Sequence, residues 1–271
     1  MKPELIFYAG SSLLEGPIWD TENKLVYCVS IEQSLIYAIN PETGHVKSFP
    51  TNGHVGCVAL NNNEELLSAE KEGVYSINPN SGSRTFIKQF EPNEEMRYND
   101  GTTDPIGRFL VGTKGYLKEL PNMGKLYSYH EGELKVIVEG TTISNGIGFS
   151  KNGSKMYFID TPTKKVGQYN YNPETGEAQF EKYIIEIDGT GWPDGLCVDL
   201  DGNIWVAEWQ GSRVCKWNPE TGVKLTEVKL PCKNVTSCCL GGDHNEFLFI
   251  TTAKEHKNSN ELAGGLFKIK L

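Results

Sequence analysis

The phrase Ile39-Asn40-Pro41-Glu42-Thr43-Gly44 decides the fold, because it recurs along the chain in the same setting. Related phrases begin at Ile77, Tyr171 and Trp217, and each follows a short run of alternating apolar and polar residues. Asn-Pro opens a tight turn and Gly closes it, so each phrase predicts a connection between two antiparallel strands. The recurrence therefore indicates a repeated all-β structure.

A second recurring unit consists of two apolar runs joined by a polar turn that contains Asn or Gly. Residues 196–200 and 204–207 flank the turn at 201–203, and residues 147–149 and 156–159 flank a similar turn. These are hairpin signatures. Helix-period segments long enough for β-α-β units are absent from the sequence, which argues against an α/β fold.

The repeat has a period in the forties, since the residues that open successive units are 41 to 49 positions apart. Such a period, with about four short strands in each repeat, is typical of a β-propeller blade. The chain of 271 residues has room for six such repeats. We therefore predict an all-β, six-bladed β-propeller; the alternatives are a two-sheet sandwich and a seven-bladed ring with one poorly marked blade. The opening residues are Glu15, Gly56, Asn99, Asn145, Asp194 and Ser237.

The two ends of the chain are expected to complete one blade together. After the last predicted hairpin, residues 247–252 with 266–269, little chain remains. An open sheet edge is a liability, so we expect Leu5–Ala9 to supply the missing strand and close the ring. Residues 1–271 would then form a single propeller domain.

Composition and charge exclude several classes of protein. Lys and Arg total 26 against 35 Asp and Glu, which gives a formal charge of −9 and disfavours a nucleic-acid partner. No apolar run approaches the roughly 20 residues of a membrane span, and the first residues lack the pattern of a secretion signal. Seven cysteines without a Cys-x-x-Cys pair indicate reduced thiols. We expect a cytoplasmic protein that is a monomer or a weak homo-oligomer.

Four of the six opening positions carry a side-chain carboxylate or amide: Glu15, Asn99, Asn145 and Asp194. In a propeller the innermost strand of each blade lines a central channel, so corresponding positions of different blades converge on the axis. Oxygen donors that meet there could form a cage for a hard cation. The alternative is that Asn and Asp before Gly are ordinary turn formers. A Glu at the first position is not explained by turn chemistry.

Several motifs resemble the regucalcin, gluconolactonase and luciferin-regenerating-enzyme family of six-bladed, calcium-dependent lactonases. They occur in order across the whole chain, and together they are specific although no single one is. The segments are Glu15-Gly-Pro-Ile-Trp19, Arg97-Tyr-Asn-Asp-Gly101, Asp104-Pro105-x-Gly107-Arg108, Gly112-Thr113, Ile143-Ser-Asn-Gly146, Pro193-Asp-Gly-Leu-Cys-Val-Asp199, Leu200-Asp-Gly-Asn-Ile-Trp-Val-Ala207 and Thr236-Ser-Cys-Cys-Leu-Gly-Gly242.

The resemblance implies a role for five residues. Carried over motif by motif, it implies that Glu15, Asn145 and Asp194 hold one divalent cation. It also implies that Arg97 and Asn99 contact the substrate. An Arg at such a position is otherwise usually part of a surface ion pair.

The expected activity is hydrolysis of a sugar lactone, such as a gluconolactone, to the open hydroxy acid. Two carboxylates and an amide leave a cation with open positions, where it can polarise the lactone carbonyl. Asp194 would serve both as a metal ligand and as the general base. All-oxygen ligation favours calcium, with magnesium, manganese and zinc as alternatives. A hydrolase of another ester or a phosphotriester at the same site, or a calcium-binding propeller without activity, are the other hypotheses.

The chain departs from the family pattern between Lys114 and Pro121, where Tyr116 and Lys118 are placed to shape a lid. Family members with sugar specificity place an acidic substrate-binding residue near this point, and Glu119 is a weak candidate for it. Trp192 is as well placed to wall the pocket as to lie in the core or on the rim, and His54 could reach the channel. The segment that begins at Asp199 looks like the start of an EF-hand loop but lacks its final Glu, so we expect a hairpin turn.

Overall fold

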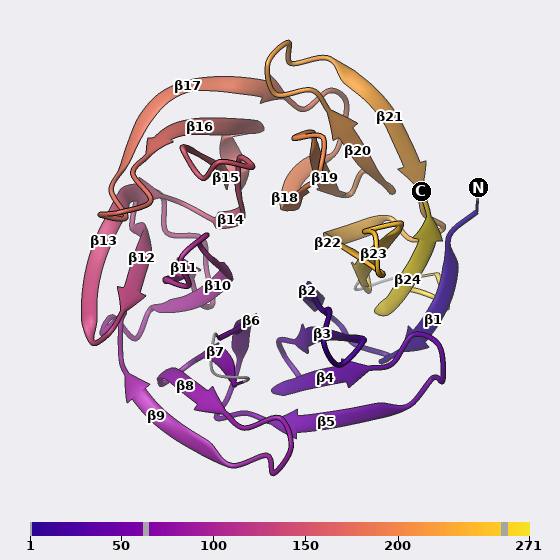
Figure 1. Ribbon diagram of the computed structural model, residues 1–271, viewed down its shortest axis with the longest axis horizontal. Coiled ribbons are helices and arrows are strands. Elements are labelled where there is room, and N and C mark those ends of the chain that lie inside the picture. The colour runs from indigo at the N-terminus through magenta and orange to yellow at the C-terminus, as the bar shows by residue number, and fades with distance from the viewer. Residues whose placement is uncertain (1, 62–64, 256–259) are drawn as a thin grey trace.

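A computed structural model describes residues 2–61, 65–255 and 260–271 of the chain. Their 24 β-strands form six antiparallel four-stranded sheets around a central axis (Figure 1). The one helical element in this part of the chain is a short 3-10 turn, η1 (Thr161–Thr163). The predicted six-bladed β-propeller is therefore confirmed. No helix among the described residues is long and apolar enough to cross a membrane.

Each sheet follows the chain from the axis outward, with one exception at the closure of the ring. The first five sheets are β2 (Leu14–Asp20), β3 (Leu25–Ser30), β4 (Leu35–Ile39) and β5 (Val46–Pro50); β6 (Val55–Leu60), β7 (Leu66–Glu70), β8 (Gly73–Ile77) and β9 (Arg84–Lys88); β10 (Met96–Thr103), β11 (Phe109–Gly115), β12 (Gly124–His130) and β13 (Glu133–Thr141); β14 (Ser144–Phe149), β15 (Lys155–Asp160), β16 (Lys165–Tyr171) and β17 (Ala178–Glu186); β18 (Trp192–Val198), β19 (Ile204–Trp209), β20 (Arg213–Trp217) and β21 (Lys224–Lys229).

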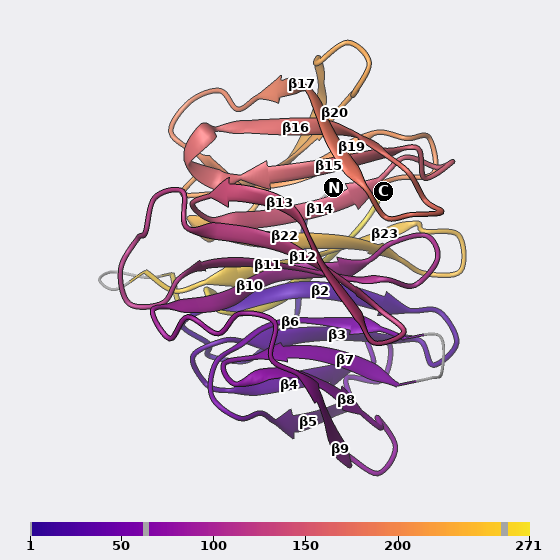
Figure 2. The ribbon, with the colours of Figure 1, turned by 90° about the vertical axis from the view of Figure 1, so that its left-hand side faces the viewer.

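The sixth sheet joins the two ends of the chain. Its strands are β22 (Asn234–Gly241), β23 (Phe247–Ala253), β24 (Gly265–Lys270) and, outermost, β1 (Glu4–Tyr8). Leu5 pairs with Phe267 and Tyr8 with Gly265, so the termini lie beside each other (Figures 1 and 2). The closure expected from the N-terminal strand is confirmed, with the strand beginning and ending one residue earlier than predicted.

The recurring Asn-Pro phrases form the turns between the third and fourth strands of four blades. In the first, Asn40 Oδ1 accepts hydrogen bonds from the backbone N–H groups of Glu42 at 3.0 Å and Thr43 at 2.9 Å. Gly44 donates to the Asn40 carbonyl at 2.9 Å with a φ of +71°, a conformation that favours glycine. Since strands alternate in direction, these turns lie at the end of the blade where the innermost strand finishes. We call this end the far face, and the end where the innermost strands begin the near face.

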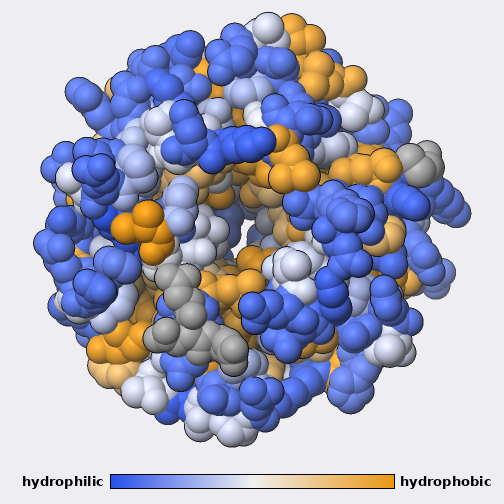
Figure 3. Space-filling model, in the orientation of Figure 1, coloured by the Kyte–Doolittle hydropathy of each residue, from blue (hydrophilic) through white to orange (hydrophobic). Residues whose placement is uncertain are grey.

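The hydrophobic core is divided among the six boundaries between neighbouring blades. One cluster, for example, packs Trp205 and Val214 of one blade against Cys238 and Ile250 of the next. Clusters of the same kind join the other neighbouring pairs and close the circle. The seven cysteines are free, and six of them are buried in this core, as expected for reduced thiols. Side chains fill the wedges between blades, while the axis remains open (Figure 3).

Every innermost strand carries one extra residue relative to its neighbour. The pairing shifts at Glu15/Ile18 in β2, at Tyr98/Gly101 in β10, at Ser144/Ile147 in β14 and at Pro193/Leu196 in β18, and the same occurs in β6 and β22. Such β-bulges bend a strand and turn side chains out of the regular alternation. The six bulges occur at the same level of the propeller, directly below the near face.

Candidate active site

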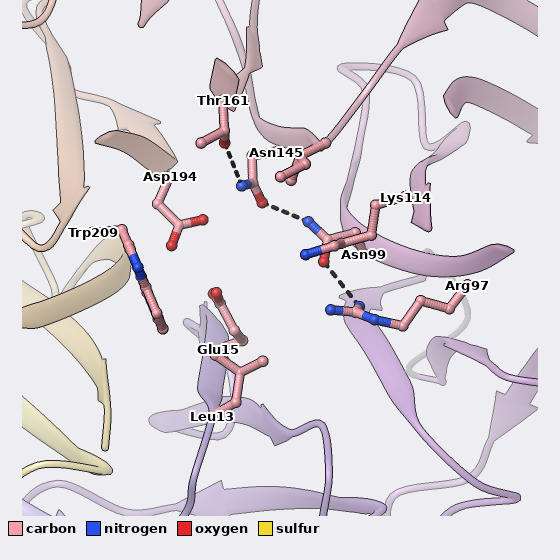
Figure 4. A pocket seen from close by; sticks show the side chains of 10 residues that line it. Leu13, Glu15, Arg97, Asn99, Lys114, Asn145, Thr161, Asp194 and Trp209 are labelled. Atoms are coloured by element: carbon pink, nitrogen blue, oxygen red, sulfur yellow. Dashed lines mark hydrogen bonds between the residues drawn. The ribbon is translucent and has the colours of Figure 1, made fainter. Parts of the chain in front are cut away.

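A cavity of about 240 Å³ opens on the near face at the axis of the ring. It is smaller than the roughly 300–1,000 Å³ of pockets that take drug-sized ligands, so its volume fits a small molecule such as a single sugar ring. Inner strands and the strands that pair with them supply its walls (Figure 4). The lining residues are Leu13, Glu15, Arg97, Asn99, Lys114, Ile143, Asn145, Thr161, Asp194 and Trp209.

The structure brings together all five residues that the sequence singled out. Glu15, Asn99, Asn145 and Asp194 come from four different blades and line the same cavity, with Arg97 two residues before Asn99. All four lie at the bulged level of their strands. The predicted convergence is therefore found, and the individual roles stay predictions.

Glycines beside these residues allow the inner strands to approach closely. A Cβ atom on Gly146 would lie 2.8 Å from the Asp194 carbonyl oxygen, and one on Gly195 would lie 2.0 Å from Ser237 Oγ. Both distances are shorter than real Cβ contacts, so a side chain at either position would force neighbouring blades apart. The Asn-Gly and Asp-Gly pairs of the sequence thus combine a polar side chain with a narrow channel.

A chain of hydrogen bonds fixes the amide groups of the site (Figure 4). Arg97 Nη1 donates to Asn99 Oδ1 at 2.9 Å, and Asn99 Nδ2 donates to Asn145 Oδ1 at 2.7 Å. Asn145 Nδ2 then donates to Thr161 Oγ1 at 2.7 Å, and that hydroxyl donates to the Pro193 carbonyl at 2.8 Å. Because each carbonyl oxygen has two lone pairs, Asn145 Oδ1 keeps one for a ligand on the axis.

Two buried carboxylates, Glu15 of β2 and Asp194 of β18, point toward each other on one side of the cavity (Figure 4). Burial and the Asp194 carboxylate raise the pKa of Glu15 well above its usual value. Burial, followed by the nearby Asp100 carboxylate, raises the pKa of Asp194 well above its own. Gly16 N–H donates to Glu15 Oε2 at 3.1 Å, but neither carboxylate forms an ion pair within the described part of the chain.

The donor set fits a hard divalent cation. Buried carboxylates of like charge are stable together only when a cation or protons neutralise them. Glu15 and Asp194 supply two charged oxygen donors and Asn145 Oδ1 a neutral one, which suits calcium or magnesium. Among the described residues, no group of three His, Cys, Asp or Glu side chains could hold a metal ion. The amide oxygen of Asn145 is therefore the third donor that this site can offer.

Asp100 belongs to the other end of the channel. It lines a second cavity of about 290 Å³, which is walled by residues of the inner strands β2, β10, β14, β18 and β22. Burial raises the pKa of Asp100 to about 6. Asp100 adds negative potential behind Glu15 and Asp194 without lining the near-face cavity.

Two cationic side chains occupy the wall opposite the carboxylates (Figure 4). Arg97 of β10 and Lys114 of β11 are direct partners in the strand pairing. Burial lowers the pKa of Arg97 to about 10, and burial together with the Arg97 charge lowers the pKa of Lys114 to about 8. The cavity therefore has an acidic wall and a basic wall.

Two lining residues that the sequence analysis missed could have been found from strand alternation. Leu13 and Ile143 stand two positions before Glu15 and Asn145. Because alternate residues of an extended chain face the same side, each shares the channel side of the polar residue that follows it.

Lys114, Thr161 and Trp209 were missed because their positions depend on the hairpins. Each lies within one residue of the end of the second strand of its blade, where the chain returns to the level at which the innermost strand begins. Trp209, for example, pairs with Trp192, which stands two residues before Asp194. Once the hairpins are predicted, the end of each second strand marks a candidate lining position.

Other sequence candidates lie outside the cavity wall. Trp192 is at the rim, where the Lys164 ammonium lies 4.4 Å from the centre of its ring, and Glu119 is exposed. His54 packs edge-on against Tyr116 and does not line the cavity. Asp199 forms the expected hairpin turn, since its Oδ1 accepts the N–H groups of residues 201 and 203.

The motif that contains Asp104 and Arg108 lies at the far face. Arg108 Nη1 is 2.8 Å from Asp104 Oδ2, and it donates to the Pro173 carbonyl of the next blade at 2.7 Å. Tyr171 OH donates to Asp104 Oδ2 at 2.7 Å. The motif that contains Asp104 and Arg108 therefore joins two neighbouring blades through an ion pair and hydrogen bonds.

A six-bladed propeller with a polar cavity on its axis defines the structural class of this chain. Residues 13–254 match the family model described as the SMP-30/Gluconolactonase/LRE-like region. The chain is 34% identical to "Putative sugar lactone lactonase YvrE" of Bacillus subtilis, over 95% of this chain and 90% of that protein. It is 30% identical to regucalcin of Xenopus laevis, over 94% and 89%. The chain therefore belongs to the SMP-30/gluconolactonase/LRE-like family.

Solved structures show the same architecture. A luciferin-regenerating enzyme superposes with a TM-score of 0.90 at 25% identity, covering 99% of this chain and 95% of that one. A regucalcin of Agrobacterium tumefaciens, described as a calcium-binding protein, gives a TM-score of 0.93 at 23% identity, covering 99% and 93%. At 23% identity, the likeness to the regucalcin structure supports the fold alone.

Proposed function

We propose that this protein is a divalent-metal-dependent lactonase that opens a sugar lactone to the hydroxy acid. The observation that carries the proposal is one small cavity in which Glu15, Asp194 and Asn145 Oδ1 face Arg97 and Asn99. Membership of a family that includes a protein named as a sugar lactone lactonase supports the same reaction.

Glu15, Asn145 and Asp194 would hold the cation, and their all-oxygen donor set makes calcium the first choice. When bound there, the cation supplies a Lewis acid that polarises the lactone carbonyl and stabilises developing negative charge. Magnesium, manganese and zinc are the alternatives to test.

The chain's own side chains bind the substrate and move the proton. Asp194 has a second carboxylate oxygen, which can accept a proton from the attacking water as a general base. Arg97 can donate from its guanidinium to oxygens of the substrate, and Asn99 orients it by a direct hydrogen bond. Trp209 and Leu13 add apolar surface for the carbon face of a sugar ring.

The decisive experiment measures hydrolysis of sugar lactones and simple γ- and δ-lactones by the purified protein with calcium, magnesium, manganese or zinc. We expect turnover that a chelator abolishes and that added metal restores. Asp194→Asn should lower kcat/KM by about 10³-fold, within the range for loss of a general base. The matched control is Asp201→Asn, which changes an exposed carboxylate in the turn after β18 and should leave kcat/KM unchanged.

The same panel includes a phosphotriester and an aryl ester. If the protein hydrolysed the phosphotriester or the aryl ester but none of the lactones, the proposed substrate class would be wrong and the proposed site would stand. Absence of turnover for every compound, with metal binding retained, would favour a calcium-binding propeller and would refute the lactonase.

A further inference from the structure

The Arg97–Lys114 pair is an unusual arrangement for a β-sheet. The two residues stand directly opposite each other on β10 and β11, and both line the active-site cavity. Like charges in this position repel and destabilise a strand pair. Burial of both side chains near the axis increases that cost, so packing alone does not account for two cations here.

Neither Arg97 nor Lys114 forms an ion pair with a carboxylate in the described part of the chain. Arg97 Nη1 donates to the Tyr98 carbonyl at 2.8 Å and to Asn99 Oδ1 at 2.9 Å, which are neutral acceptors. Glu15 contributes most among the acids that raise the pKa of Arg97, and Asp194 most among those that raise the pKa of Lys114. The other acids that contribute, Glu32 to Arg97 and Glu119 to Lys114, are exposed.

The net formal charge of the cavity lining becomes positive when a divalent cation is held. Glu15 and Asp194 balance Arg97 and Lys114, so the wall is neutral by formal charge. A divalent cation between the two carboxylates neutralises them and leaves both positive charges of the opposite wall uncompensated. A neutral sugar lactone would bring no charge to that wall.

We propose that the substrate is a lactone with an additional anionic group, a carboxylate or a phosphate, that binds between Lys114 and Arg97. This inference rests on the proposed lactonase function and specifies its substrate class. The lactone carbonyl faces Glu15, Asn145 and Asp194, and the anionic substituent reaches the opposite wall. Lys114 supplies a mobile ammonium and Arg97 a planar fork of donors, a combination suited to either anion.

Two other half-buried lysines have acidic partners. Lys216 lies 2.8 Å from Asp199, and Lys155 lies 2.7 Å from Glu181. Lys114 differs because its side chain extends into a cavity and has no such partner among the described residues (Figure 4). An apolar residue of similar length, such as methionine, would fill the same space if packing were its role.

The kinetic test compares gluconolactone with glucarolactone, which carries a carboxylate in place of the terminal hydroxymethyl group, and with phosphogluconolactone. We expect the wild type to prefer one or both charged lactones by kcat/KM. Lys114→Met should lower the charged-to-neutral ratio by about ten- to a hundredfold, the range for a hydrogen bond between charged groups. Lys114→Arg should retain part of the preference. Lys118→Met is the control, because Lys118 is exposed and pairs with Glu95 outside the cavity.

The two charged lactones distinguish the source of the anion. Preference for glucarolactone alone assigns a carboxylate, and preference for phosphogluconolactone alone assigns a phosphate. A wild-type ratio near one for both, or a ratio that Lys114→Met leaves unchanged, overturns the inference while the lactonase proposal stands.

A binding measurement gives a readout independent of turnover. Calorimetry in the presence of calcium compares the open products gluconate and glucarate, which differ by one carboxylate. We expect glucarate to bind more tightly to the wild type, with the difference reduced in Lys114→Met. Equal affinities would overturn the inference even if no lactone were hydrolysed, so its failure is distinct from failure of the proposed function.

Discussion

The two ends of the β10–β11 hairpin use a buried arginine in opposite ways. Arg108, at the far face, is 7% exposed, pairs with Asp104 and donates to carbonyls of the next blade. Arg97, at the near face, is 8% exposed and donates only to neutral acceptors in the described structure. Equal burial therefore does not mean equal function. The partner of each arginine separates a structural link from a side chain that is available to a ligand.

The same distinction holds for other buried charges. Glu70 binds Arg84, and Glu208 lies 2.9 Å from Arg213, so each glutamate is paired within its own blade. At the axis, by contrast, acids and bases stand on opposite walls. Charges that a fold keeps apart at an energetic cost are candidates for function.

The largest expected difference between the two arginines is in stability. Arg108→Met leaves the Asp104 carboxylate buried without its cation, so we expect the free energy of unfolding to fall by about 3–5 kcal/mol. Arg97→Met leaves no ion-pair partner behind, so the free energy of unfolding should fall by only about 1 kcal/mol, for the lost hydrogen bonds. Urea denaturation of both variants measures these values.

Activity should show the reverse order. Folded Arg108→Met should retain wild-type kcat/KM, whereas Arg97→Met should lose about ten- to a hundredfold for lack of a charged donor to the substrate. If Arg97→Met were as destabilised as Arg108→Met and fully active, the distinction between the two ends of the hairpin would be wrong.

A second comparison concerns the acidic wall with and without metal. In a chelator, the folded protein binds protons more tightly than the unfolded chain, because the pKa values of Glu15, Asp194 and Asp100 are raised. Stability from these groups is complete below their ordinary pKa values, near 4, and is lost as the pH rises through the folded-state values, about 6 for Asp100. Thermal melts between pH 4 and about 7 should therefore show a falling Tm.

Saturating calcium should reduce that fall and stabilise the protein by about 2.7 kcal/mol at a hundred times the Kd. Glu15→Gln should flatten the profile in chelator and weaken calcium binding by at least the ~10–100-fold typical of changes next to a metal. A profile that is unchanged by both calcium and Glu15→Gln would place the cation elsewhere.

The smallest expected effect concerns the hydroxyl that orients Asn145. Thr161→Val removes the acceptor for Asn145 Nδ2 and the donor to the Pro193 carbonyl. We expect calcium affinity to fall about tenfold, as for other residues that orient a metal ligand, with a parallel loss of kcat at low calcium. Calorimetry measures the affinity, and Thr161→Ser is the control that should restore it. A matching loss in Thr161→Ser would contradict the orienting role.

The fold was predictable because its signals are local and repeated. Each Asn-Pro-x-x-Gly phrase specifies a turn by its own hydrogen bonds, and the spacing of Glu15, Asn99, Asn145 and Asp194 follows the blades. The convergence of these four side chains then follows from ring symmetry. The resemblance to a known family gave the same positions a proposed role.

What escaped prediction depends on pairing between strands. The bulge in each inner strand is a shift of register between two paired strands, and no single residue of the sequence indicates it. In the sequence, Lys114 is only the first residue of the segment that departs from the family pattern. Its place in the cavity wall follows from its pairing with Arg97, which the sequence does not show. Arg97 and Arg108 both belong to motifs that carry the family resemblance. Only the residues that surround each one in the folded structure show that their roles differ.

The closure of the ring by β1 also affects how the protein is made. Of the 24 described strands, β1 is synthesised first and its partner β24 last, so β1 stays unpaired until the other strands of the propeller have been made. Until then the edge of β1 has no partner, and an exposed strand edge can pair with another chain. A short deletion at the amino terminus would thus leave a permanently open blade, with self-association as its cost.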